Sequence, residues 1–368
     1  MANIMDYLSW RGDLRWEAAE FNEVDNLILS ELIYVSFSGI VPAVGAGEIT
    51  LRRASELFFE KYTDEEINAK VSSTKVAAFM MRKMAQTVRF GGILLSNYVD
   101  DIDLDVQSQF CAMTVQLGDG RMCVVYSGTD STIVGWKENF NMSFLSETPG
   151  QLKAVRYLAG VAAQNHMPLR LMGHSKGGNL SVYAATHTDP ATMERIEVIY
   201  SNDGPGFTKS MISEENYRRM IPKIHTIIPE SSIVGMLLEH EEEYEVVESS
   251  GSGAGQHDVM SWEVEGGSLV HKSGVDETAV LVDRTLKSWI DKMDNRQREE
   301  FVDTLFGVLE DAGIRTVDDL ARINPSKFRE LVRISSSLDR ESQEVMRDAA
   351  KRFFEESSNA LKEAFFRK

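Results

Sequence analysis

A serine between closely spaced glycines has the clearest chemical potential in this 368-residue sequence. The segment Gly173-His174-Ser175-Lys176-Gly177 matches G-x-S-x-G, a sharp turn that presents a nucleophilic serine between a strand and a helix. Glycines two residues before and after the serine remove side chains that would clash in such a turn. An apolar run at 169–172 precedes the motif, and a helical pattern at 179–188 follows it. Ser175 is therefore a candidate nucleophile for acyl transfer.

A serine hydroxyl needs a base that removes its proton, and the base needs an acid that orients it. Of the seven histidines, His257 fits the role of base best, because it lies late in the chain, after the glycine-rich loop 251–255. His271 is the other late candidate. His174, inside the motif, is interpreted as a structural residue whose side chain points away from the nucleophile.

Two carboxylates are candidates for the orienting acid. Asp203 follows the apolar run 196–200, and Glu230 follows the run 224–228. Functional groups of open α/β sheets gather at the carboxyl ends of strands, so either carboxylate can approach a histidine there. Asp203 is the preferred acid and Glu230 the alternative, although an aspartate before Gly204-Pro205 can also simply organise a turn.

Two backbone N–H groups are expected to stabilise the oxyanion that forms when a serine attacks a carbonyl. One is that of Lys176, directly after the nucleophile, and the other is that of Thr129, just after the β-like run 121–126. No metal and no organic cofactor is expected. The reason is that no group of His, Cys and Glu has the spacing of metal ligands, and no glycine pattern matches a dinucleotide fingerprint.

The elements that must position these residues predict an α/β fold. A hairpin is expected at 110–117 and 121–126, and after it strands alternate with helices, which is typical of a mostly parallel sheet covered on both faces. The expected helices after the hairpin are 148–165, 179–188 and 277–293, and the expected strands are 169–172, 196–200, 224–228, 245–248 and 262–264.

The chain is expected to divide into a domain of residues 1–293 and a helical C-terminal appendage of residues 294–368. Within the first part, residues 48–90 are interpreted as helices that form an insertion or a lid. The loop 131–145 is rich in large apolar residues and is expected to line an acyl pocket or to join the core. The appendage is expected to contact the core or a second subunit, which leaves a homo-oligomer through these helices open.

Composition narrows the range of partners. The chain has 39 Lys and Arg against 57 Asp and Glu, and the net charge of −18 argues against nucleic acids and anionic membrane surfaces. Cys111 and Cys123 are too few for a disulfide framework. Since neither a signal peptide nor a membrane-spanning segment is apparent, a cytoplasmic protein without stable membrane insertion is expected.

Several further motifs occur in a characteristic order. They are Asp6–Asp13, Tyr126–Asp130, Gly135–Met142, Gly173–Leu180, Asn202–Phe207, Ser231–Gly235 and Gln256–Asp258. Together they resemble an uncharacterised bacterial lipase-like family with a G-H-S-K-G-G motif, related to the fungal-type class 3 lipases. The resemblance covers most of residues 1–290. It implies an α/β-hydrolase fold, with Ser175 as nucleophile, His257 as base and Thr129 as an oxyanion donor.

The sequence departs from the class 3 pattern at two positions. Ser127 stands where those lipases commonly have arginine before the Gly-Thr pair. The segment Ser231-Ser232-Ile233-Val234-Gly235 has serine in place of the aspartate that would be the catalytic acid. This second departure is a reason to prefer Asp203 as the acid.

These observations predict a serine hydrolase of the esterase or lipase type that acts on a small-molecule acyl ester through Ser175, His257 and Asp203. A thioesterase, peptidase or acyltransferase using the same three residues is one alternative. A catalytically inactive α/β-hydrolase that serves as a binding or scaffold module is the other, and the missing class 3 acid supports it.

Overall fold

The computed structural model describes residues 1–351 except 70–74, 104, 106–107, 130–131, 143, 316–324, 339, 341, 345–346 and 348–350. Asp130 of the expected oxyanion turn lies outside the described residues, as do residues 352–368 of the expected appendage. No helix within the described ranges is both long and apolar enough to cross a membrane.

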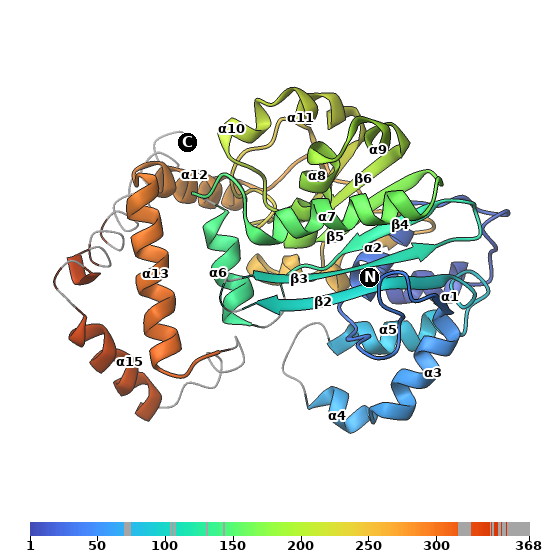
Figure 1. Cartoon of the computed structure of the whole chain (residues 1–368), viewed down its shortest axis with the longest axis horizontal. Coiled ribbons are helices and arrows are strands. Elements are labelled where there is room, and N and C mark those ends of the chain that lie inside the picture. Colours follow the sequence, from blue (N-terminus) through green and yellow to red (C-terminus); the bar gives the residue numbers. More distant parts are fainter. Residues whose placement is uncertain are drawn as a thin grey trace.

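An eight-stranded sheet forms the centre of the molecule, with its strands side by side in chain order (Figure 1). Strands β1 to β4 pair antiparallel, and β4 to β8 pair parallel. The prediction of an α/β fold with a mostly parallel sheet is confirmed. The strands are β1 Glu48–Thr50, β2 Leu94–Asp103, β3 Ser108–Gln116, β4 Met122–Tyr126, β5 Leu169–His174, β6 Ile196–Asn202, β7 Ile224–Pro229 and β8 Tyr244–Val247.

Helices cover both faces of this sheet. Because side chains alternate along a strand, Met113 and Val125 lie in one apolar cluster, and Ala112 and Val124 lie in another. The first cluster includes the N-terminal helices α1 Ile4–Arg11, α2 Glu23–Leu32, α3 Leu51–Lys61, α4 Asp64–Asn68 and α5 Lys75–Ala85. The second includes α7 Pro149–Gln164, α8 Lys176–His187, α9 Pro190–Arg195, α10 Lys209–Ile212 and α11 Glu215–Met220.

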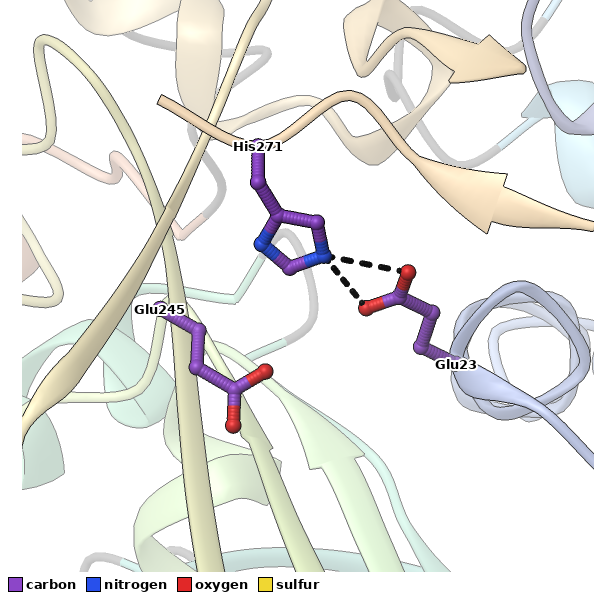
Figure 2. A group of neighbouring side chains, drawn as sticks. All are labelled: Glu23, Glu245 and His271. Carbon is purple, nitrogen blue, oxygen red and sulfur yellow. Dashed lines mark hydrogen bonds and ion pairs between the residues drawn. The ribbon is translucent and has the colours of Figure 1, made fainter. Parts of the chain in front are cut away.

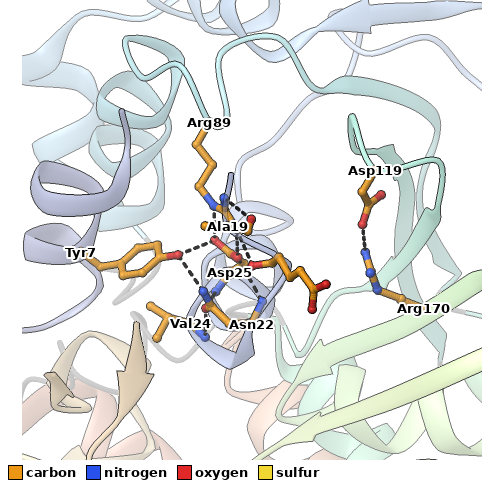
Figure 3. A network of polar contacts seen from close by, with 9 residues as sticks. Tyr7, Ala19, Asn22, Val24, Asp25, Arg89, Asp119 and Arg170 are labelled. Atoms are coloured by element: carbon orange, nitrogen blue, oxygen red, sulfur yellow. Dashed lines mark hydrogen bonds and ion pairs between the residues drawn. The ribbon is translucent and has the colours of Figure 1, made fainter. Parts of the chain in front are cut away.

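A buried ion pair fixes the N-terminal helices to one another (Figure 3). Arg89 donates from Nε to Asp25 at 2.8 Å, and both side chains are fully buried. The Tyr7 hydroxyl donates to the same carboxylate at 2.9 Å, and the Arg89 guanidinium lies 3.8 Å from the centre of the Trp16 ring. Burial raises the pKa of Asp25, and the hydrogen bonds from Arg89 oppose this shift. The network holds α2 in place, and α2 in turn contacts β5.

Three elements differ from the sequence expectation. Strand β2 was not expected, because its sequence is rich in aspartate and a bulge at Asn97, with φ of 54°, interrupts its alternation. Helix α6, Ile133–Asn141, occupies most of the region expected to be a loop. The helix expected from Glu48 begins at Leu51, because residues 48–50 pair with β2 as the edge strand β1.

The described residues after 293 include helices α13 Asn295–Asp311 and α15 Pro325–Ser337. They follow α12 Glu277–Asp291, and a short hairpin of β9 Val264–Glu265 and β10 Ser268–Leu269 precedes it. Helix α13 lies against α6 (Figure 1), where the rings of Phe140 and Phe306 are 5.6 Å apart and Lys137 pairs with Asp303 at 2.8 Å. Helix α6 therefore contacts α13 through both an aromatic pair and an ion pair.

Candidate active site

Ser175 lies in the sharp turn between β5 and α8, with a backbone φ of 57° and ψ of −131°. Few non-glycine residues adopt a positive φ, and such strain is found where the surrounding structure enforces it. A Cβ atom on Gly173 would lie 2.3 Å from the Gly177 backbone, and one on Gly177 would lie 2.2 Å from the Tyr126 carbonyl oxygen. The two glycines are therefore required for the turn, as the motif predicts.

The structure brings Asp203 and His257 together. Asp203 follows β6, and His257 ends a short 3₁₀ helix, Gly253–His257. His257 Nδ1 lies 2.6 Å from Asp203 Oδ2, and the aspartate side chain is fully buried whereas the histidine is partly exposed. This is the contact by which a carboxylate orients an imidazole so that Nε2 can act as a base.

Ser232 supports the carboxylate from the opposite side. Its hydroxyl donates to Asp203 Oδ1 at 2.5 Å, and the Gly235 backbone N–H donates to the same oxygen at 3.1 Å. Ser232 belongs to the segment that the sequence resemblance matched to the acid segment of class 3 lipases. In this chain that segment supplies a hydrogen bond to an aspartate from the preceding strand.

His257 approaches the serine turn through His174, and no hydrogen bond joins Ser175 to His257 among the described residues. The His257 ring lies 4.5 Å from the ring of His174, the residue before the serine. Within the described ranges, the Ser175 hydroxyl has no hydrogen bond, and the residue is 8% exposed. Hydrogen bonds between catalytic groups are often long in the absence of substrate, so this geometry is compatible with a serine–histidine pair.

His174 has a role that its position in the motif did not reveal. Its Nε2 lies 2.9 Å from the backbone carbonyl oxygen of His257, and its Nδ1 lies 3.0 Å from the Tyr34 hydroxyl. Burial, together with the nearby His257, lowers the pKa of His174 to about 3. The ring is therefore neutral, with Nε2–H donating to the carbonyl and Nδ1 accepting from the tyrosine. It connects the serine turn to the loop that carries the base.

The expected oxyanion donors lie on both sides of the serine. The backbone of Gly128 is so close that an added Cβ would lie 3.1 Å from Ser175 Cβ and 2.0 Å from the Tyr34 hydroxyl. Thr129 follows directly, and its hydroxyl exchanges hydrogen bonds with Asn139 of α6 at 2.7 and 3.0 Å. Lys176 is the first residue of α8, where a backbone N–H has no acceptor inside the helix.

The side chain of Lys176 forms a contact that the sequence did not predict. Its Nζ donates to the Gln109 carbonyl at 2.6 Å and lies 3.0 Å from Glu138 Oε2, and both charged side chains are completely buried. Glu138 belongs to α6 and also accepts from the Gly150 backbone N–H at 2.7 Å. Since α6 also holds Thr129, this ion pair ties the expected oxyanion turn to the serine turn.

The alternative residues lie elsewhere. Among the described residues, Glu230 has no hydrogen bond to His257, and its carboxylate lies 3.7 Å from Lys272. His271 lies 3.0 Å from Glu23, far along the sheet from β5.

The parallel strands and the strand–turn–helix junction at Ser175 are those of an α/β-hydrolase fold. The pattern of the Mbeg1-like family matches residues 84–307, well over half of the chain. The chain therefore belongs to the Mbeg1-like family, a lipase-like family. The predicted resemblance to a lipase-like family is confirmed.

Solved structures similar to this chain include two lipases. The Rhizomucor miehei lipase propeptide complex shares 17% identity over 42% of this chain and 57% of that chain, with a TM-score of 0.31. The M37 lipase shares 13% identity over 59% of this chain and 70% of that chain, with a TM-score of 0.33. This chain thus spans little more than half of the Rhizomucor lipase. No curated protein matches it.

Proposed function

We propose that this protein is a serine hydrolase that cleaves a small-molecule acyl ester through Ser175, His257 and Asp203. The observation that carries the proposal is the 2.6 Å contact between His257 Nδ1 and the buried Asp203 carboxylate, next to the strained turn of Ser175. A buried carboxylate on one nitrogen of an imidazole leaves the other nitrogen free to take a proton.

In the proposed reaction, Ser175 Oγ attacks the ester carbonyl carbon while its proton passes to His257 Nε2. The carbonyl oxygen becomes an oxyanion, which the backbone N–H groups of Thr129 and Lys176 stabilise. The C–O bond to the alcohol breaks, and the alcohol leaves with the proton from His257. Water then attacks the acyl-enzyme with His257 again as base, which releases the carboxylic acid and restores Ser175.

The buried Lys176–Glu138 pair supports the proposed oxyanion site. Electrostatic stabilisation is strongest when the donors are held in place before the reaction. Glu138 fixes α6 to the serine turn, and Asn139 on the same helix holds the Thr129 side chain. The net charge of −18 favours small or neutral acyl substrates over anionic bilayers.

Hydrolysis of short p-nitrophenyl esters tests the proposal. Ser175→Ala is expected to lower kcat by at least about a thousand-fold, because it removes the nucleophile. Ser213→Ala, at an exposed serine outside the site, is the matched control and is expected to retain full activity. Equal rates for the wild type and Ser175→Ala would contradict the proposal.

The leaving group is tested with paired substrates. The wild-type protein is offered oxygen esters and thioesters of the same acyl group, and kcat/KM is compared. A preference for oxygen esters supports the esterase assignment. A preference for thioesters would show that the same three residues act as a thioesterase site.

A further inference from the structure

Glu23, Glu245 and His271 come from distant parts of the sequence and meet on one side of the sheet (Figure 2). Glu23 lies in the first turn of α2, Glu245 lies on β8, and His271 follows β10. One ligand atom from each residue lies within 4.8 Å of the other two. We infer that these three residues bind a divalent transition-metal ion, with Zn²⁺ as the best fit.

Backbone hydrogen bonds hold the segment that carries His271 against the sheet. His271 forms an antiparallel bridge with Val247, and the neighbouring Lys272 N–H donates to the Val246 carbonyl at 2.8 Å. This bridge brings His271 beside β8 and therefore close to Glu245. Regular secondary structure fixes ligands more tightly than a loop does, so little ordering is needed when an ion binds.

The distances between the side chains suit a metal. His271 Nε2 lies 3.1 and 3.0 Å from the two carboxylate oxygens of Glu23, and Figure 2 shows Glu245 beside this pair. Ligand atoms in a tetrahedral zinc site are about 3.3 Å apart, given metal–ligand bonds of about 2.0 to 2.1 Å. Small side-chain adjustments can therefore place all three groups around one ion.

Neighbouring groups orient the two carboxylates. His225 Nδ1 lies 2.5 Å from Glu245 Oε1, and the Leu269 backbone N–H donates to Glu23 Oε1 at 2.8 Å. Hydrogen-bonded partners of this kind are typical around metal ligands, where they fix ligand orientation. Each carboxylate keeps a second oxygen that can face an ion.

The donor set determines which ions fit. Two carboxylates and a neutral imidazole carry a charge of −2, which a divalent ion neutralises. Imidazole nitrogen favours zinc and other late transition metals, whereas Ca²⁺ and Mg²⁺ prefer oxygen ligands alone. An ion here would hold the start of α2 against the sheet. The same helix ends shortly before Tyr34, which contacts His174.

Calorimetric titration of the full chain with ZnCl₂, after treatment with a chelator, tests the inference. We expect one saturable site and no comparable binding of MgCl₂. Glu245→Gln and His271→Gln are each expected to weaken zinc binding at least ten-fold. The control is His187→Gln, at a histidine 3.4 Å from the single carboxylate of Glu214, and it is expected to bind zinc like the wild type.

Circular dichroism verifies that each variant is folded. If one of these two ligand variants does not fold, Glu23→Gln replaces it, because Glu23 is partly exposed. Absence of saturable zinc binding by the wild type would overturn the inference. Binding unchanged in the folded ligand variants would overturn it as well. Ser175→Ala is expected to bind zinc normally, so the result does not depend on the proposed hydrolase activity.

Discussion

At the scale of single residues, the site depends on a histidine held from two directions. Asp203 contacts the Nδ1 atom of His257, and His174 contacts its backbone carbonyl. Only the first contact was expected from the sequence. The second contact joins His174 to a residue 83 positions away, and no sequence pattern indicates such a bond. Tyr34, which contacts the other nitrogen of His174, does not belong to any motif.

Replacement of the proposed acid tests the assignment of Asp203. Asp203→Asn is expected to lower kcat by about ten-thousand-fold, since an amide no longer holds the imidazole in the tautomer that accepts a proton at Nε2. Glu230→Gln is the matched control and is expected to retain activity. The measurement is ester hydrolysis at neutral pH. If Asp203→Asn kept its activity and Glu230→Gln lost it, Glu230 would be the acid.

Loss of the Tyr34 hydroxyl tests the hydrogen-bonded connection through His174. Tyr34→Phe removes one neutral hydrogen bond, worth about 0.5 to 1.5 kcal/mol, so kcat is expected to fall roughly two- to ten-fold with KM unchanged. Tyr157→Phe removes a buried hydroxyl whose partner is the distant Asn97 carbonyl, and it is expected to leave kcat unchanged. Equal effects of the two variants on kcat would show that Tyr34 contributes only to stability.

At the scale of elements, the strands and helices around Ser175 were predictable, whereas β2 and α6 were not. An apolar run followed by a glycine-rich turn marks β5 and α8 clearly. Strand β2 contains a bulge and several aspartates, and its identity depends on pairing with β3. Helix α6 is short, and its contacts with α13 and the Lys176–Glu138 pair are tertiary features without a local pattern.

The buried pair between α8 and α6 has a predicted energetic signature. Lys176→Met leaves the Glu138 carboxylate buried without its cation, which is expected to lower the free energy of unfolding by about 3 to 5 kcal/mol. The double variant Lys176→Met with Glu138→Gln is expected to recover much of this loss. Urea unfolding measures both. If Lys176→Met alone were as stable as the wild type, water would have to reach Glu138.

At the scale of the whole molecule, stability is expected to depend on the neutral state of His174. Its pKa is about 3 in the folded protein and near the ordinary value of about 6.5 when unfolded. The unfolded chain therefore binds more protons between these values, so this group removes stability as the pH falls from about 6.5 toward 3. In this range the free energy of unfolding falls by about 1.4 kcal/mol for each unit by which the pH decreases.

Urea unfolding at pH 6.5, 5.5 and 4.5 measures this contribution. The stability of the wild type is expected to fall more steeply with acidification than that of His174→Asn, because the asparagine does not titrate. If the stability of the two proteins fell equally steeply with pH, His174 would have to become protonated in the folded protein.

Residues that are distant in the sequence and meet only in the folded chain could not be predicted to form a site. The sequence predicted no metal site, because Glu23, Glu245 and His271 have no ligand spacing along the chain. Their proximity results from the position of α2 on the sheet and from the bridge between His271 and Val247. The folded arrangement therefore adds a candidate site to the one that the serine motif indicated.

The central claim is that Ser175 is a nucleophile activated by His257. Its most direct test is treatment of the protein with a fluorophosphonate at neutral pH, followed by intact-mass measurement and peptide mapping. We expect one adduct per chain, located on Ser175, with none on Ser175→Ala and much slower labelling of Asp203→Asn. No adduct on the wild type, or an adduct on a different residue, would contradict the claim.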